Sequence, residues 1–429
     1  MRECPFTCWY APPSENADDS RTLRPGIVPP VTSPRRAGSP AEVFGAFLKL
    51  GLTSFGGPVA HLGYFRDELV TRRRWIDDRG YGELVALSQF LPGPASSQVG
   101  FGLGLLRAGP LGALAAWLAF TLPSAIIMVA FAYGADLFGG TIGSGILDGL
   151  KIVAVAIVAQ AVWGMARSLT PDARRASIAV GAAVLVLVVA GTLGQVAAIV
   201  LGALAGLLLC RMPGETPGPD LDFGVSRRVG ATSLAVFAVL LVGLPIAAAT
   251  LGGTVVGVAD AFYRAGALVF GGGHVVLPLL EAEVVTGGWV DAEQFLAGYG
   301  VAQAVPGPLF TFAAYLGALA APGAAGLATA AIALVAVFVP GFLLLVGVLP
   351  FWNALRTRPA AQALLRGANA AVVGILAAAL YDPVFVTAVT GPASFALALV
   401  CFVLLISWRV PPWVVVIVGA VCGVGLAFL

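Results

Sequence analysis

The sequence has little charge, and this shortage sets the class of protein. Only 11% of its 429 residues are Asp, Glu, Lys or Arg, against about 25% in soluble chains. Apolar residues make up 59%, and several stretches exceed the roughly 18 uncharged residues that can cross a bilayer as a helix. We therefore predict an all-α polytopic membrane protein. The net charge of only +2 gives no indication of a nucleic-acid partner.

Histidine and cysteine are also scarce. The two histidines, His61 and His274, and the five cysteines show no metal-ligand spacing beyond a lone Cys-x-x-x-Cys at 4–8 in the tail, so we expect no metal and no cofactor. The chain has no Gly-x-x-x-x-Gly-Lys-Ser/Thr motif and no recognisable nucleophile–base pair, so neither an ATPase nor another enzyme is expected. Residues 1–40 lack the apolar run of a signal peptide and predict a disordered cytoplasmic tail.

Glycine and proline, in contrast, are abundant and fall into a duplicated pattern. Phe-Gly-Gly-Pro at 55–58 recurs as Phe-Gly-Gly-Gly at 270–273. At nearly the same offset, Trp-Ile-Asp at 75–77 recurs as Trp-Val-Asp at 289–291, and Pro-Gly-Pro at 92–94 recurs at 306–308. A duplicated membrane domain with matched helix breaks is typical of transporters. We predict a first repeat at 41–212, a cytoplasmic linker plus joining transmembrane helix at 213–257, and a second repeat at 258–429.

Charge predicts how the repeats are oriented. Basic clusters, from the N-terminal tail and Arg66–Arg79 to Arg409, are expected on the cytoplasmic side. The apolar stretches 43–63 and 84–106 should then enter and leave on one side, as re-entrant segments, unless they are ordinary spans bent at Gly and Pro. The loop Glu281–Glu293 is acidic and should lie outside. The fold predicted is therefore two inverted-topology repeats with broken or re-entrant helices, with about nine full spans or about 13.

A matched pair of cations marks a candidate anion site. Lys49 lies six residues before Phe55, and Arg264 lies six residues before Phe270. Ionisable residues inside membrane segments are costly and are often functional. We predict that both cations bind an anion; the alternative is that each extends to the membrane interface for structural reasons.

The breaks themselves supply the other groups of the predicted site. A half-helix that begins after a glycine break offers free N–H groups and partial positive charge, and Pro-Gly-Pro prevents a continuous helix. This arrangement suits a small anion that carries more than one charge. His61 and His274 are proton-coupling candidates, or else satisfied interfacial histidines. The predicted substrate-binding residues are Lys49, Ser54, Phe55, Gly56, Gly57, Gln89, Pro92, Gly93, Pro94 and Ser96 in the first repeat, and Arg264, Phe270, Gly271, Gly272, Gln303, Pro306, Gly307 and Pro308 in the second.

These motifs resemble the chromate ion transporter family. The resemblance rests on Phe-Gly-Gly-Pro at 55–58, Trp-Ile-Asp at 75–77, Pro-Gly-Pro at 92–94 and their second copies, and covers about residues 42–428, as in the long two-domain form. It implies export of chromate across the inner (cytoplasmic) membrane and chromate resistance. We expect drive by the proton-motive force, contact of Arg66–Arg79 with membrane lipid, and a possible homodimer. The alternatives are transport of sulfate or another oxyanion, or a membrane enzyme or non-transport membrane subunit.

Overall fold

Helices account for every regular element in the part of the chain that the structure describes. The computed structural model describes residues 38–134, 140–189, 191–211, 223–270 and 273–428. Most of the predicted tail and part of the predicted linker lie outside these ranges. The first half contains α1 (Pro40–Thr53), α2 (Gly57–Phe65), η1 (Arg66–Arg72), α3 (Asp78–Phe90), α4 (Ala95–Gly134), α5 (Gly140–Leu169), α6 (Ala173–Val188) and α7 (Thr192–Leu209).

A joining helix, α8 (Arg227–Leu251), leads to the second half. The elements of that half follow a similar order, although several are broken into shorter pieces. They are α9 (Thr254–Leu268), η3 (Gly273–Val275), α10 (Val276–Val284), α11 (Ala292–Ala304), η4 (Leu309–Thr311), α12 (Phe312–Leu319), α13 (Ala324–Val348), η5 (Leu349–Phe351), α14 (Trp352–Arg356), α15 (Pro359–Ala379), η6 (Leu380–Phe385), α16 (Val386–Ala388), α17 (Pro392–Ile406) and α18 (Pro412–Leu426).

The two halves begin and end helices at matched positions. Both ends of α3 correspond to the ends of α11, at the offset that relates the two Pro-Gly-Pro motifs. Each of these two helices is capped by an aspartate, because Asp77 Oδ1 accepts from Gly80 N at 2.8 Å and Asp291 Oδ1 accepts from Gln294 N at 2.7 Å. The backbone of α4 leaves the helical conformation at residues 108–109, and the segment that follows corresponds in the same way to α13.

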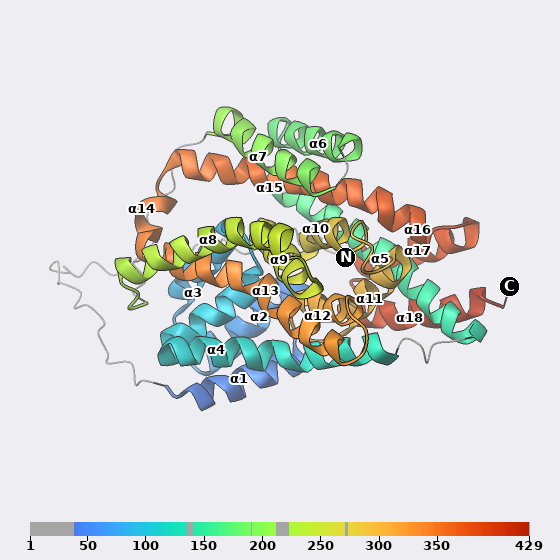
Figure 1. The fold of residues 1–429 in the computed structure, drawn as a ribbon, viewed down its shortest axis with the longest axis horizontal. Coiled ribbons are helices and arrows are strands. Elements are labelled where there is room, and N and C mark those ends of the chain that lie inside the picture. Colours follow the sequence, from blue (N-terminus) through green and yellow to red (C-terminus); the bar gives the residue numbers. More distant parts are fainter. Residues whose placement is uncertain (1–37, 135–139, 190, 212–222, 271–272, 429) are drawn as a thin grey trace, which may run out of the picture. The chain divides into compact units, whose positions relative to one another are not determined.

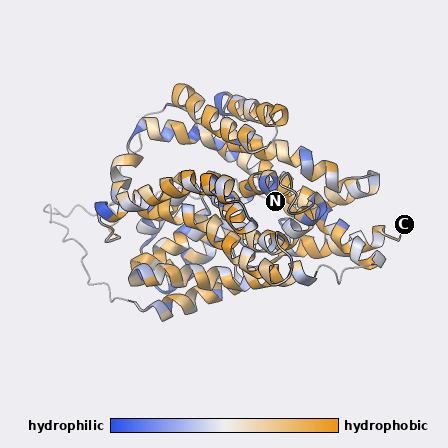
Figure 2. Ribbon diagram, in the orientation of Figure 1, coloured by the Kyte–Doolittle hydropathy of each residue, from blue (hydrophilic) through white to orange (hydrophobic). Residues whose placement is uncertain are grey.

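The chain is a polytopic membrane protein. Within the described ranges, six helices are long and apolar enough to cross a bilayer, and apolar colour dominates the ribbon in Figure 2. Six is fewer than the predicted number of about nine full spans or about 13, since several apolar segments form shorter helices. The helices α17 and α18 have 15 residues each, about 22 Å at 1.5 Å per residue, which is less than the hydrocarbon thickness of about 30 Å.

The ends of the two predicted re-entrant stretches lie together. Gly38 N donates to Arg107 O at 3.0 Å, and the Arg107 guanidinium pairs with Glu42 at 3.0 Å. The same guanidinium lies 5.4 Å from the centre of the Trp75 ring. The start of α1, the segment after η1 and the residue that precedes the break in α4 therefore meet at one place, as expected if both stretches enter and leave on the same side.

The long helices of the two halves run antiparallel where they pack. Trp117 in α4 lies 5.8 Å from Phe338 in α13, measured between ring centres. Farther along α4, the Tyr133 hydroxyl donates to Gly323 O at 2.7 Å, just before α13 begins. Residue numbers thus rise along one helix as they fall along the other.

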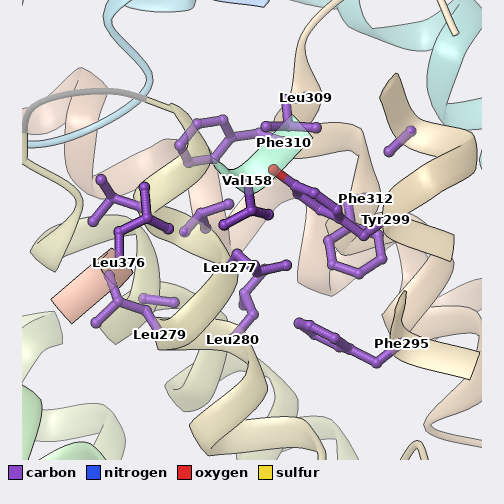
Figure 3. Close-up of a cluster of buried hydrophobic side chains, with 14 of the residues drawn as sticks. Val158, Leu277, Leu279, Leu280, Phe295, Tyr299, Leu309, Phe310, Phe312 and Leu376 are labelled. Carbon is purple, nitrogen blue, oxygen red and sulfur yellow. The ribbon is translucent and has the colours of Figure 1, made fainter. Parts of the chain in front are cut away.

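Each half also packs its last two helices onto a long helix of the other half. In the first half, α5 packs against α17 and α18; in the second, α15 packs against α6 and α7, which lie beside it in Figure 1. Glycines permit the close approach, with Gly149 against Gly419, and Gly206 against Gly367. Figure 3 shows the apolar core that results, where Val158 of α5 meets side chains of α10, η4 and α12.

Candidate functional site

The Pro-Gly-Pro break of each half is hydrogen-bonded to the residue that precedes the glycine break of the other half. Gly93 N, in the first Pro-Gly-Pro, donates to Val269 O, just before the second glycine break, at 2.7 Å. Gly307 N, in the second Pro-Gly-Pro, donates to Ser54 O, just before the first glycine break, at 2.9 Å. The four broken segments named by the sequence are therefore brought together in pairs, and each pair contains one segment from each half.

Only glycine fits the centre of each Pro-Gly-Pro break. The φ angles of Gly93 and Gly307 are +124° and +99°, a region that L side chains rarely adopt. A Cβ atom on Gly93 would lie 2.9 Å from the Cα of Gly341, and one on Gly307 would lie 2.7 Å from Ser124 Oγ. Each break is thus held against a long helix of the opposite half.

The first glycine break has the predicted geometry. The helix α2 begins at Gly57 directly after the break, with Pro58 in its first turn, as expected for a half-helix that presents its N-terminus. Pro58 also lies against Gly273, because a Cβ atom there would be 3.2 Å from Pro58 Cγ. The predicted residues Gly271 and Gly272, which form the second glycine break, lie outside the described residues.

Several buried polar atoms on or beside the breaks have no hydrogen-bond partner among the described residues. Leaving a buried donor or acceptor unpaired costs about 1–3 kcal/mol, so a group of them indicates a place for a polar ligand or water. Ser54 and Gln303 are among the predicted substrate-binding residues, and Ser97 was expected to supply a neutral hydrogen bond, whereas Gln98 and Thr121 were missed. The atoms are Ser54 Oγ, Ser97 Oγ, Gln98 Oε1, Thr121 Oγ1 and Gln303 Nε2.

A pocket of about 260 Å³ opens beside the first glycine break. Both halves contribute to it, since Gly56 and Gly57 come from the first break while His274 and Gln303 come from the second half. The remainder of the lining comes from α5, from the end of α17, and from the turn that leads into α18: Ile157, Gln160, Leu405, Arg409, Val410, Pro411 and Pro412.

Each predicted cation is held by a glutamate. Lys49 Nζ lies 2.7 Å from Glu68 Oε2, and Arg264 Nη1 lies 2.9 Å from Glu283 Oε1. In both pairs the acid follows the cation by 19 residues, so the carboxylate is duplicated together with the cation. The sequence contains this pattern, because Glu68 and Glu283 are separated by the same offset as the two Phe-Gly-Gly motifs, but the sequence analysis did not identify it. Neither cation is among the residues that line the pocket.

The surroundings of the two ion pairs differ in charge. Glu68 also binds Arg72 at 3.0 Å and Arg73 at 2.9 Å. Burial favours a higher pKa for Glu68, but the hydrogen bonds and charges of Lys49 and the two arginines outweigh it and lower the pKa to about 2, so this acid is ionised at neutral pH.

The second pair gains acidic and neutral groups instead. Asp260 Oδ2 lies 2.7 Å from Arg264, and Thr192 Oγ1 donates to Glu283 at 2.7 Å. The first cluster therefore has three cations around one carboxylate, whereas the second has two carboxylates around one cation.

The two histidines occupy different environments. His61 is buried, with Nδ1 3.4 Å from Ser96 Oγ, and its ring meets the edge of Phe120 at 5.3 Å. His274 Nδ1 lies 2.8 Å from the Tyr299 hydroxyl, and this histidine lines the pocket.

The remaining predicted residues are spread around the breaks. Phe55 lies 6.2 Å from Trp413, measured between ring centres, so it contacts the start of α18. Gln89 is exposed, while Pro92, Phe270 and Pro306 are half-buried and Pro94 and Pro308 are buried. No group of three or more His, Cys, Asp or Glu side chains within the described ranges is placed to hold a metal ion.

Comparisons with known proteins point to one family. The family model described as "Chromate transporter" matches residues 41–207 and 256–424. A protein from Synechococcus elongatus named "Probable chromate transport protein" is 30% identical over 88% of this chain and 93% of its own length. "Chromate transport protein" from Cupriavidus metallidurans is 31% identical over 87% and 90%. Its namesake from Pseudomonas aeruginosa is 28% identical over 86% and 85%. No solved structure gives a significant match.

Proposed function

The chain belongs to the chromate transporter family, and we propose that it is a secondary transporter, not an enzyme, that exports chromate from the cytoplasm across the inner membrane. Such export would give chromate resistance. Because the sequence has no nucleotide-binding motif, we propose that the proton-motive force drives it.

The reciprocal pairing of the helix breaks is the observation that carries this proposal. Irregular backbone at membrane depth is tolerated where it lines a cavity or is buried in protein, and transporters place it at the substrate site between their halves. A tetrahedral oxyanion presents four acceptor oxygens. The N–H groups at Gly56 and Gly57, and the side-chain atoms Ser54 Oγ and Gln303 Nε2, are suitable neutral partners.

We further propose that the halves are inverted repeats that expose the site alternately to the two sides. The antiparallel packing of α4 against α13 supports this arrangement. So does the exchange in which each half packs its last helices onto the other. Rocking of one half against the other around the breaks would then carry the anion across the membrane without exposing its charge to the lipid.

Lys49 and Arg264 remain proposed anion-binding residues, and their glutamate partners suggest how they act. While no anion is present, Glu68 and Glu283 neutralise them. A doubly charged anion could compete with these carboxylates as it passes. We therefore expect Lys49→Ala and Arg264→Ala to abolish chromate exclusion by cells while the protein remains in the membrane. Normal resistance in both variants would contradict this role.

Uptake into everted membrane vesicles tests the function directly. Export from the cell becomes uptake in this orientation, so we expect radiolabelled chromate to accumulate in vesicles that contain the protein. Accumulation should fall when a protonophore dissipates the gradient. Vesicles that carry the protein but take up chromate no faster than control vesicles would contradict the proposal.

The same vesicles address the alternative substrate. Sulfate has the shape and charge of chromate, so the groups at the breaks are chemically able to bind it as well. We expect a tenfold excess of sulfate to leave most chromate uptake intact if the transporter prefers chromate. Complete competition, together with uptake of labelled sulfate, would assign the protein to sulfate or to oxyanions in general.

A further inference from the structure

The pocket at the first glycine break is lined by a basic side chain, Arg409, that the sequence analysis places only among the cytoplasmic basic clusters. We propose that Arg409 supplies the positive charge that binds the oxyanion in this pocket. The inference rests on the proposed function, because it names a further residue of the same site. Lys49 and Arg264 do not line the pocket, whereas Arg409 lines it with Gly56 and Gly57.

The turn that carries Arg409 is built to place it. Arg409 has a φ angle of +54°, a left-handed conformation that costs a non-glycine residue about 1–2 kcal/mol and often marks functional sites. Two prolines follow at 411 and 412, and Val410 N donates to Leu404 O at 2.9 Å. The backbone around the arginine is thus restrained on both sides.

Two contacts from the first half hold this turn beside the break. Trp413, at the start of α18, contacts Phe55. From α5, Gln160 also lines the pocket, and its Nε2 lies 3.5 Å from Leu405 O.

The chemistry of the pocket fits a tetrahedral oxyanion. A guanidinium presents a planar fork of donors that binds two oxygens of such an ion at once. The pocket volume of about 260 Å³ is several times the roughly 30 Å³ that one water occupies in the liquid, so an oxyanion enters with part of its hydration. Gly56 and Gly57 N–H groups and the Gln160 and Gln303 amides complete a set of donors with no carboxylate among the lining residues.

The first half has no equivalent cation. Its corresponding turn, between α6 and α7, has Val-Ala-Gly at 189–191. The start of α7 contacts the second ion pair, because Thr192 Oγ1 donates to Glu283 Oε1. A single arginine at one of two related turns is consistent with a specific task and not with a requirement of the repeated fold.

Charge-altering variants of Arg409 test the inference in the same everted vesicles. We expect Arg409→Gln to raise the KM for chromate about 10- to 100-fold, the loss expected for one charged hydrogen-bonding partner. Arg409→Lys keeps the charge without the fork and should give an intermediate KM. Arg211→Gln is the matched control, since Arg211 is an exposed arginine after α7, the helix equivalent to α18, and does not line this pocket.

A binding measurement keeps this test separate from the test of function. Chromate or sulfate should raise the melting temperature of the purified wild-type protein, and the midpoint concentration should increase at least tenfold in Arg409→Gln. If wild-type vesicles fail to transport chromate but sulfate binding still depends on Arg409, the substrate assignment fails and this inference stands. If Arg409→Gln and Arg409→Lys both keep KM and binding midpoints within twofold of wild type, or the wild type binds neither oxyanion, the inference is wrong.

Discussion

The two halves of this protein share a framework and differ in charge. Both have an aspartate cap, a Pro-Gly-Pro break and a cation–glutamate pair at matched positions. Yet the first pair is surrounded by extra arginines and leaves the Lys49 side chain 49% exposed, whereas the second gains Asp260 and leaves Arg264 27% exposed. The two halves thus share the groups that fix the backbone and differ in the charge of the groups around them.

The basic segment Arg66–Arg79 and the acidic loop Glu281–Glu293 are predicted to lie on opposite sides of the membrane. This prediction should give the largest measurable difference between the halves. In a background without native cysteines, Thr71→Cys and Thr286→Cys place exposed thiols after Glu68 and after Glu283. A membrane-impermeant maleimide added to intact cells should label Thr286→Cys and spare Thr71→Cys, with the reverse in everted vesicles. Labelling of both from one side would remove the inverted arrangement.

Because the two Pro-Gly-Pro breaks correspond, we expect the protein to be equally sensitive to substitution of the central glycine in either half. Gly93→Ala and Gly307→Ala should each lose most of the folded protein, because a left-handed φ costs about 1–2 kcal/mol and the added methyl group overpacks a helix contact, typically at about 1–3 kcal/mol. Size-exclusion profiles of detergent-solubilised protein measure the loss. Gly82→Ala is the control, since a Cβ atom there meets nothing within 4 Å. A monodisperse, fully expressed Gly307→Ala variant would show that the second break tolerates a side chain.

The two ion pairs should differ in strength. A double-mutant cycle of Lys49→Ala and Glu68→Ala should give a coupling below about 1 kcal/mol, because Lys49 is half-exposed. The less exposed Arg264–Glu283 pair should give roughly 1.5–3 kcal/mol. Thermal or urea unfolding in detergent supplies both numbers. Equal couplings would mean that exposure does not distinguish the halves.

Removal of the aspartate caps should give the smallest loss of stability, and the loss should be nearly the same in both halves. Asp77→Ala and Asp291→Ala should each destabilise the protein by about 1 kcal/mol, as expected for loss of a helix N-cap. Asp77→Asn and Asp291→Asn should be nearly neutral, because asparagine caps as well as aspartate. Melting temperatures of the four variants measure this. An alanine effect in only one half would show that the corresponding helices are not equally important to stability.

Features that depend on local backbone chemistry could be predicted from the sequence. Pro58 and Pro92 indicated where helices begin and end, and the structure has helix boundaries there. The re-entrant course of the first stretches followed from the charges at their ends, and the contact of Gly38 with Arg107 agrees with it. The helix boundaries could be predicted because proline and glycine restrict the chain within a few residues, whereas the re-entrant course stays a prediction.

Features that depend on contacts between distant segments were missed. The sequence pointed to Lys49 and Arg264 but not to the glutamates that neutralise them, although the matched spacing was visible in retrospect. It treated Arg409 as a cytoplasmic marker, since nothing local shows that the turn after α17 lies beside the break after α1. Thr121 was overlooked because isolated hydroxyls in apolar helices are common.

The sequence by itself determined that the protein is an all-helical membrane protein, that its apolar body is duplicated, and where its helices break. Composition and the restricted backbone of glycine and proline act wherever those residues stand, so no folding partner is needed to infer them. Only the tertiary structure decided which breaks pair, which carboxylate neutralises each cation, and which arginine reaches the pocket. Those outcomes depend on short distances between segments that lie in different halves of the chain, and packing alone sets such distances.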